Sequence, residues 1–229
     1  MKTVIQTPTN GLVQSLEYYV KLGFQIVSKE SPIVVTDGKA VIEINPERTA
    51  RAGLKCFAKD WKDVVSELKK VTTVIEVEKG YLLSDPSGMW IYLVEAELDI
   101  RIQKEERSFA KVGNFAGLSL ETLDMKKSAQ LFTLLGFTVG MGGIEDGWMT
   151  LISEDQLGVS LMKPNTCPHL FFNPSLTYFN GSNNDAIIDE IRGLEIPIVE
   201  EITHFNPKDE VDNIIIRDPG GLGCFLFND

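Results

Sequence analysis

Cysteine and histidine are scarce in this sequence of 229 residues. The cysteines are Cys56, Cys167 and Cys224, and the histidines are His169 and His204. An odd number of cysteines without metal-binding or redox spacing argues against a disulfide framework and against a cysteine metal site. We therefore expect reduced thiols, with Cys56 and Cys224 lying in strands as small buried apolar side chains.

Positive charge is also in short supply. The chain has 22 basic and 33 acidic residues, a net charge of −11. This balance disfavours nucleic acid and anionic membrane surfaces as partners. The first residues form no apolar signal segment, and no apolar run approaches the length that spans a membrane. We expect a soluble, cytoplasmic protein that binds neither nucleic acid nor membranes.

A turn followed by an apolar aromatic strand occurs twice in the chain. Residues 85–88 read Asp-Pro-Ser-Gly and precede a strand that ends at Val94, and residues 218–221 read Asp-Pro-Gly-Gly and precede a strand that ends at Phe227. Proline and glycine favour such turns. Leu-Gly-Phe at 22–24 likewise recurs at 135–137, 113 residues later. These repeats indicate an internal duplication.

Hydrophobic periodicity divides each half into two units of strand, helix and three strands. Asp37-Gly38 and Asp146-Gly147 are expected hairpin turns. The second half is longer, and we place its extra residues in loops 165–174 and 203–211. Helices are expected at 11–19, 60–70, 124–135 and 185–192. Strands are expected at 2–6, 25–28, 32–36, 39–45, 54–58, 72–77, 80–83, 89–94, 115–121, 148–152, 158–163, 175–179, 198–202, 213–216 and 222–227.

This order of repeated βαβββ units, with Leu-Gly-Phe and the Asp-Pro turns, resembles the vicinal oxygen chelate superfamily of glyoxalase I, bleomycin-resistance proteins and extradiol dioxygenases. The resemblance implies an α+β fold: tandem paired βαβββ modules form two cup-shaped, largely antiparallel sheets with helices outside. It implies a first domain at 1–97, with modules 1–46 and 52–97, and a second domain at 114–229. Residues 98–113 form a charged, partly helical linker.

In that family a divalent metal is bound inside the cup by two histidines and one or two glutamates or equivalents. The resemblance places the ligand positions of the second domain on Gly117, on Leu161 or Ser160, near Ser175, and on Phe225. Those of the first domain fall on Val4, Glu43, near Gly53, and on Tyr92. Only Glu43 is a good metal ligand. We therefore expect no metal and no other cofactor.

Glu43 is the candidate functional residue, and it allows two interpretations. In an apolar cup it could act as a general base or accept a hydrogen bond from a ligand. Alternatively, it faces water or pairs with Lys55. Trp90 and Tyr92 alternate along one strand and share a face, where they either stack on a planar ligand or fill the cup.

The remaining polar motifs have simpler interpretations. His169 and His204 lie in the expected loop insertions and are interpreted as surface residues, because Cys167 and His169 alone do not make a metal site. Residues 140–143 read Gly-Met-Gly-Gly but open no helix. We interpret them as a hairpin loop and not as a phosphate-binding loop.

Three functions remain open at this point. The main hypothesis is a metal-independent binding protein of the glyoxalase and bleomycin-resistance type that holds an aromatic or cationic small molecule against Glu43, Lys55, Trp90 and Tyr92. The second is a lyase or dioxygenase that uses a displaced metal site or Glu43 as base. The third is a degenerate domain that shapes an interface, favoured in the second half by Gly117, Leu161 and Phe225. The duplication favours a monomer.

Overall fold

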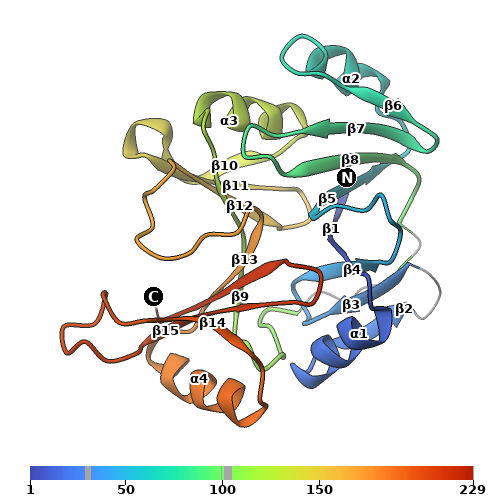
Figure 1. Cartoon of the computed structure of the whole chain (residues 1–229). Helices are drawn as coiled ribbons and strands as arrows, with labels where there is room; N and C mark the ends of the chain where they lie inside the picture. The colour runs from blue at the N-terminus through green and yellow to red at the C-terminus, as the bar shows by residue number, and fades with distance from the viewer. Residues whose placement is uncertain (29–31, 99, 101–104, 229) are drawn as a thin grey trace.

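The computed structural model describes residues 1–28, 32–98, 100 and 105–228, and within them the chain forms two eight-stranded sheets and four α-helices. Each half of the chain contributes one sheet and two helices (Figure 1). The first-half sheet has strand order β2-β3-β4-β1-β5-β8-β7-β6, and the second has β10-β11-β12-β9-β13-β16-β15-β14. The two orders match strand for strand, which confirms the predicted duplication.

The first sheet is mixed. Strand β1 pairs in parallel with β4 and β5 with β8, while its other neighbouring strands are antiparallel. The elements of this half are β1 (Lys2–Pro8), α1 (Leu12–Lys21), β2 (Gln25–Ser28), β3 (Ile33–Thr36), β4 (Val41–Asn45), β5 (Gly53–Ala58), α2 (Lys62–Leu68), β6 (Ile75–Val77), β7 (Gly80–Ser84) and β8 (Trp90–Glu95).

The second sheet repeats the pattern, with β9 parallel to β12 and β13 parallel to β16. Its elements are β9 (Phe115–Glu121), α3 (Met125–Leu134), β10 (Thr138–Gly143), the 3-10 turn η1 (Ile144–Asp146), β11 (Trp148–Ile152), β12 (Gly158–Met162), β13 (Ser175–Phe179), η2 (Gly181–Asn183), α4 (Asn184–Gly193), β14 (Ile198–Ile202), β15 (Asn213–Arg217) and β16 (Gly223–Phe227). The expected insertions form the β12–β13 and β14–β15 loops.

Local sequence explains the boundaries of these elements. Asp124 caps α3 by accepting a hydrogen bond from the backbone N–H of Lys127 at 2.9 Å, which satisfies a donor at the first turn. At the β3–β4 turn, Gly38 has φ +97°, a conformation that favours glycine. Asp37 accepts hydrogen bonds there from the N–H groups of Lys39 and Ala40.

The faces of each sheet have different roles. Along β4, Ile42 and Ile44 belong to an apolar core that continues from the first half into the second. Val41 and Glu43 occupy the alternate positions and point to the opposite face, as the pleat requires. The helices α1, α3 and α4 contact the strands of their own sheets, and α2 contacts α3. Each sheet therefore has one face in the shared core and one face free to line a cup.

Buried aspartates at hairpin turns join the two halves. Asp218, at the β15–β16 turn, accepts hydrogen bonds from the hydroxyls of Thr7 at 2.7 Å and Tyr19 at 2.9 Å. Asp37 accepts one from the Tyr178 hydroxyl at 2.8 Å. Such bonds satisfy buried polar groups and fix the contact between the halves.

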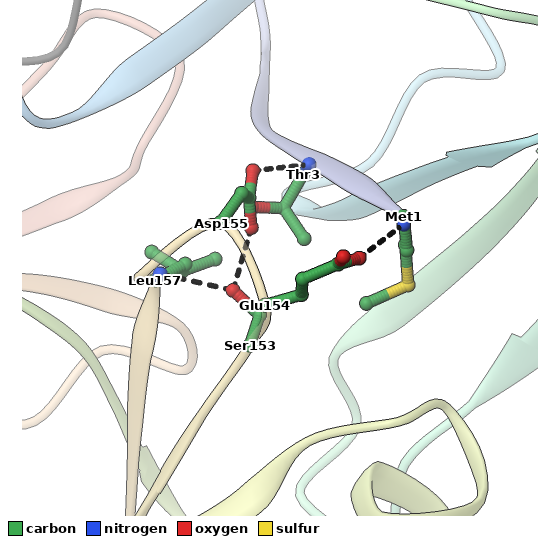
Figure 2. Close-up of polar contacts among 6 residues, drawn as sticks. All are labelled: Met1, Thr3, Ser153, Glu154, Asp155 and Leu157. Carbon is green, nitrogen blue, oxygen red and sulfur yellow. Dashed lines mark hydrogen bonds and ion pairs between the residues drawn. The ribbon is translucent and has the colours of Figure 1, made fainter.

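A third aspartate, which also belongs to the second half, makes a similar contact with the first half. Figure 2 shows Asp155, in the β11–β12 turn, accepting a hydrogen bond from the backbone N–H of Thr3 at 2.8 Å and from Ser153 Oγ at 2.6 Å. Beside it, the Met1 amino group lies 2.8 Å from Glu154. Turns of each sheet therefore dock on the first strand of the other half or near it.

Two expectations about local structure were wrong. Residues 140–143 belong to strand β10, which pairs with β11 through a bulge, because glycine is tolerated where a bulged edge strand bends. The linker contains no helix in its described residues, 98, 100 and 105–113; positions 99 and 101–104 lie outside the description. Instead, the Phe109 N–H donates a hydrogen bond to the Asp37 carbonyl at 2.8 Å.

No helix in the described part of the chain combines the length and the apolar character needed to cross a lipid bilayer.

Candidate functional site

The cup of the first sheet contains a cavity of about 590 Å³. Strands β4, β5, β7 and β8 supply most of its wall. Its lining combines charged, amide and aromatic side chains, among them Glu43, Asn45, Lys55, Phe57, Tyr81 and Tyr92. A concave surface with a few polar groups among aromatic ones is typical of small-molecule sites.

An ion pair lies in the wall of this cavity. Lys55 Nζ is 2.6 Å from Glu43 Oε1. Glu43 is 3% exposed, and the Lys55 side chain is 16% exposed. A buried carboxylate needs a charged partner, and Lys55 on the adjacent unit supplies it. Of the alternatives for Glu43, pairing with Lys55 is the observed one, and a solvated strand position is wrong.

Amide side chains hold the Glu43 carboxylate in place. Asn45 Nδ2 donates hydrogen bonds to Glu43 Oε1 at 3.2 Å and to Gln6 Oε1 at 2.9 Å. Gln6 Nε2 in turn donates to the carbonyl of Arg51 at 2.8 Å. The chain of bonds fixes the ion pair against the floor of the cup.

The predicted aromatic residues differ in position. Tyr92 lines the cavity, and Lys55 Nζ lies 5.9 Å from its ring centroid, within the range of a cation–π contact. Trp90 is half-buried and is not among the residues that line this cavity. Desolvation, followed by the carboxylates of Glu95 and Glu76, raises the pKa of Tyr81, so its hydroxyl remains protonated at neutral pH.

Part of the first cup is filled by the linker. Leu98 and Ile100 pack against a small apolar cluster formed by Val4, Val34 and Val41. This contact covers the apolar floor and leaves the polar side of the cup open. The linker therefore helps to shape the cavity, a role that its charged composition did not indicate.

The second cup also contains a cavity, of about 350 Å³. Its wall is mostly apolar and includes Trp148, His169, Phe171, Thr177, Phe225 and Phe227. The β12–β13 loop brings His169 and Phe171 into this wall, so the interpretation of His169 as a surface residue was wrong. His204 is exposed, as expected.

The polar groups of the second cup bond to one another. Ser119 Oγ lies 2.7 Å from Thr177 Oγ1, and Thr150 Oγ1 lies 2.8 Å from Ser160 Oγ. His169 Nδ1 is 2.8 Å from the Leu170 carbonyl, and its ring centroid is 5.3 Å from those of Phe225 and Phe227. No local sequence pattern predicts this arrangement, because only the path of the loop places His169 among the phenylalanines.

Strand register relates the two cups residue by residue. In the first sheet Gln6 pairs with Glu43, and in the second Ser119 pairs with Ser160. Ser160 is thus the counterpart of Glu43, whereas Leu161 faces the apolar core.

The same register shows which residues of the second cup correspond to Lys55 and Tyr92 of the first. Lys55 pairs with Tyr92 in the first sheet, and Thr177 pairs with Phe225 in the second. The charged pair of the first cup therefore has an uncharged counterpart in the second.

The side chains do not fit a divalent metal. In the first cup Glu43 is the one metal-binding side chain among the four expected positions, and it is already bonded to Lys55 and Asn45. Across the described residues, no three His, Cys, Asp or Glu side chains gather into a potential metal site. Three or more converging donors are needed to bind such an ion.

The repeated βαβββ units, the matched sheets and the two cups define a tandem vicinal oxygen chelate fold. The 2,3-dioxygenase LapB from Pseudomonas sp. KL28 has this arrangement with a TM-score of 0.60, 15% identity, and coverage of 97% of this chain and 89% of its own. The chain thus has the fold that the sequence predicts.

Two further solved structures are similar. A single-residue variant of homoprotocatechuate 2,3-dioxygenase from Brevibacterium fuscum has a TM-score of 0.59 at 14% identity, over 99% of this chain and 70% of its own. The homoprotocatechuate 2,3-dioxygenase from Arthrobacter globiformis has a TM-score of 0.57 at 14% identity, over 97% and 78%. No protein-family model and no curated protein matches the sequence. At these identities the likeness concerns the fold.

Proposed function

We propose that this protein is a metal-independent binding protein that holds a small aromatic molecule in its first cup. The observation that carries the proposal is the cavity of about 590 Å³ with the Glu43–Lys55 ion pair in its wall and Tyr92 beside it. Aromatic faces supply contact area, and a few fixed polar groups orient the ligand. Because Lys55 already neutralises Glu43, the aromatic part of the predicted ligand class has stronger support than the cationic part.

The test is a ligand screen by thermal shift, followed by calorimetry on Glu43→Gln. If Glu43 accepts a hydrogen bond from the ligand, this variant should bind more weakly by roughly 1.5–3 kcal/mol. Ser160→Ala, at the counterpart position in the second cup, is the matched control and should bind with unchanged affinity. Equal affinities of wild type and Glu43→Gln would remove Glu43 from the proposed site.

A dioxygenase is the second candidate, and its support comes from the fold neighbours, which are 2,3-dioxygenases. The donor set in the described residues argues against the metal such an enzyme would use. A general-base role for Glu43 needs no metal and belongs to this candidate. Ring-cleavage assays on catechols, with and without added iron or manganese, test it directly.

The duplication also bears on the oligomeric state. Because one chain already carries four βαβββ units and two complete sheets, we propose a monomer of 25.5 kDa. Light scattering coupled to gel filtration measures the mass in solution, and a value near twice this figure would contradict the proposal.

A further inference from the structure

The Glu43–Lys55 ion pair leaves hydrogen-bonding capacity directed at the first cavity. A lysine ammonium group has three donors, and Lys55 uses one of them on Glu43 Oε1. No second acceptor for Lys55 lies within hydrogen-bond distance in the described part of the chain. Both residues line the cavity, so free donors of Lys55 are available to a ligand.

Glu43 provides an acceptor next to these donors. Both of its protein hydrogen bonds, from Lys55 and Asn45, go to Oε1. Glu43 Oε2 has no hydrogen-bond partner among the described residues. It is not fully buried, because the one fully buried side-chain oxygen or nitrogen without a partner in these residues is Asp85 Oδ2. The wall therefore offers an acceptor and donors side by side.

The arrangement is fixed before a ligand arrives. Asn45 donates to the carboxylate and is itself held by Gln6, and the ammonium nitrogen lies 5.9 Å from the centroid of the Tyr92 ring. Preorganised groups bind with a smaller loss of conformational entropy. A ligand therefore has to match this pair as it stands.

Charge decides which ligand group matches. An anion would bond to Lys55 but meet the Glu43 charge, and a cation would bond to Glu43 but meet the Lys55 charge. Glu47, Glu78 and Lys79 also line the cavity, so the lining as a whole is close to neutral, with one excess negative charge. Adding a third charge to a largely buried pair is unfavourable, whereas a neutral group can satisfy both partners.

We propose, on the basis of the proposed binding function, that the first cup recognises an aromatic molecule through a neutral group with an acceptor and a donor side by side, such as a carboxamide or lactam. The ligand carbonyl accepts a hydrogen bond from Lys55 Nζ. The ligand N–H donates to Glu43 Oε2. The aromatic ring lies against Tyr92.

The experiment compares four ligands that share a phenyl ring: benzamide, benzoate, benzylammonium and toluene. Each is titrated at pH 7 into the ¹⁵N-labelled full chain, and amide chemical shifts report affinity and location. The second cup is closed beforehand by alkylating Cys167, which lines that cavity, with a bulky maleimide. We expect benzamide to bind the wild type at least tenfold more tightly than the other three.

Two variants make the prediction sharper by inverting the preference. Glu43→Gln leaves the Lys55 charge without its partner and should make benzoate the tightest-binding ligand. Lys55→Met leaves the Glu43 charge without its partner and should make benzylammonium the tightest-binding ligand. If either variant fails to fold, the wild-type series still decides. Shifts in the first cup with no preference among the four would overturn this inference and leave the binding function standing, whereas no binding by any phenyl ligand would overturn both.

Discussion

Asp85 and Asp218 occupy the same turn in the two halves but differ in their hydrogen bonds. Both turns have the same backbone bonds, from Gly88 to Asp85 and from Gly221 to Asp218. Asp218 accepts from two hydroxyls of the other half, whereas Asp85 is 3% exposed and its Oδ2 has no partner among the described residues. An unpaired buried oxygen is uncommon and needs an explanation.

The repeat supplies that explanation. The hydroxyls that bond to Asp218 belong to Thr7 and Tyr19, and 113 residues later the chain has Leu120 and Phe132. The counterparts also match in packing, because Tyr19 contacts Phe24 edge-on at 5.1 Å and Phe132 contacts Phe137 at 5.2 Å. The two positions equivalent to the donors of Asp218 therefore carry no hydroxyl that could bond to Asp85.

The first prediction follows from this asymmetry. Phe132→Tyr should supply a hydroxyl donor to Asp85 and raise the free energy of unfolding by about 1 kcal/mol. Urea denaturation measures the change. Because the gain requires the carboxylate, it should vanish when Asp85→Ala is added.

A matched control comes from the other half. Tyr19→Phe removes a donor from Asp218 and should lower the free energy of unfolding by roughly 1–3 kcal/mol. A loss of stability in Phe132→Tyr would mean that the new hydroxyl is buried without reaching Asp85, and the counterpart relation would then fail at this position.

At the scale of elements, the docked β15–β16 turn makes stability depend on pH. Burial raises the pKa of Asp218, outweighing the hydrogen bonds from Thr7, Leu222 and Tyr19 that lower it. The folded state then holds the proton more tightly than the unfolded chain. This contribution to stability is complete below the unfolded pKa of about 3.9 and is lost as pH rises through the higher folded pKa.

The second prediction uses Asp218→Asn, which cannot ionise. As pH rises from 4 to 7, the free energy of unfolding of the wild type should fall relative to that of the variant. Urea denaturation at several pH values gives the difference. Asp146→Asn, at an exposed turn, is the control. If the difference in free energy of unfolding between Asp218→Asn and the wild type stayed constant from pH 4 to 7, the prediction would be contradicted.

The β12–β13 loop can be tested through its cysteine. Cys167 is half-buried, while Cys56 and Cys224 are buried. Burial, followed by the charge of Glu121, raises the pKa of the Cys167 thiol, and the thiolate is the reactive form.

The third prediction is therefore a single alkylation. Iodoacetamide should modify Cys167 alone in the folded protein, slowly at pH 7 and faster as the solution becomes alkaline. Mass spectrometry should find one adduct in the native chain and three after unfolding. Adducts at Cys56 or Cys224 under native conditions would show that the core opens more readily than its packing indicates.

At the scale of the whole molecule, the fold and the side chains lead to different expectations about metal binding. The neighbours in fold are dioxygenases, but the four cup positions of the first half are Val4, Glu43, Gly53 and Tyr92. One carboxylate does not offset the dehydration of a divalent ion, which needs several donors at about 2.0–2.3 Å.

The fourth prediction is that the purified protein retains no stoichiometric transition metal. Elemental analysis after dialysis against dilute chelator, and again after adding back zinc, manganese, iron and nickel, is the measurement. One equivalent of metal that is retained by the wild type and lost in Glu43→Ala would favour the dioxygenase candidate over the binding protein.

The sequence by itself determined the duplication, the four βαβββ units and the turns that open the last strands. These features depend on local interactions: alternation along a strand, helical periodicity, and turns that need proline or glycine. Strands β9, β11, β13 and β14 begin and end where the sequence predicts. Residues 140–143 of strand β10 were interpreted as a loop because glycines have no side-chain pattern to read.

Only the tertiary structure decided what the cups contain. Lys55 meets Glu43 because β5 and β4 both pair with β1, and Leu98 reaches the cup floor because the linker folds back over it. His169 enters the second cavity through the path of a loop. Such contacts join residues distant in sequence, so no local pattern records them, and the balance of charge in the first cup depends on them.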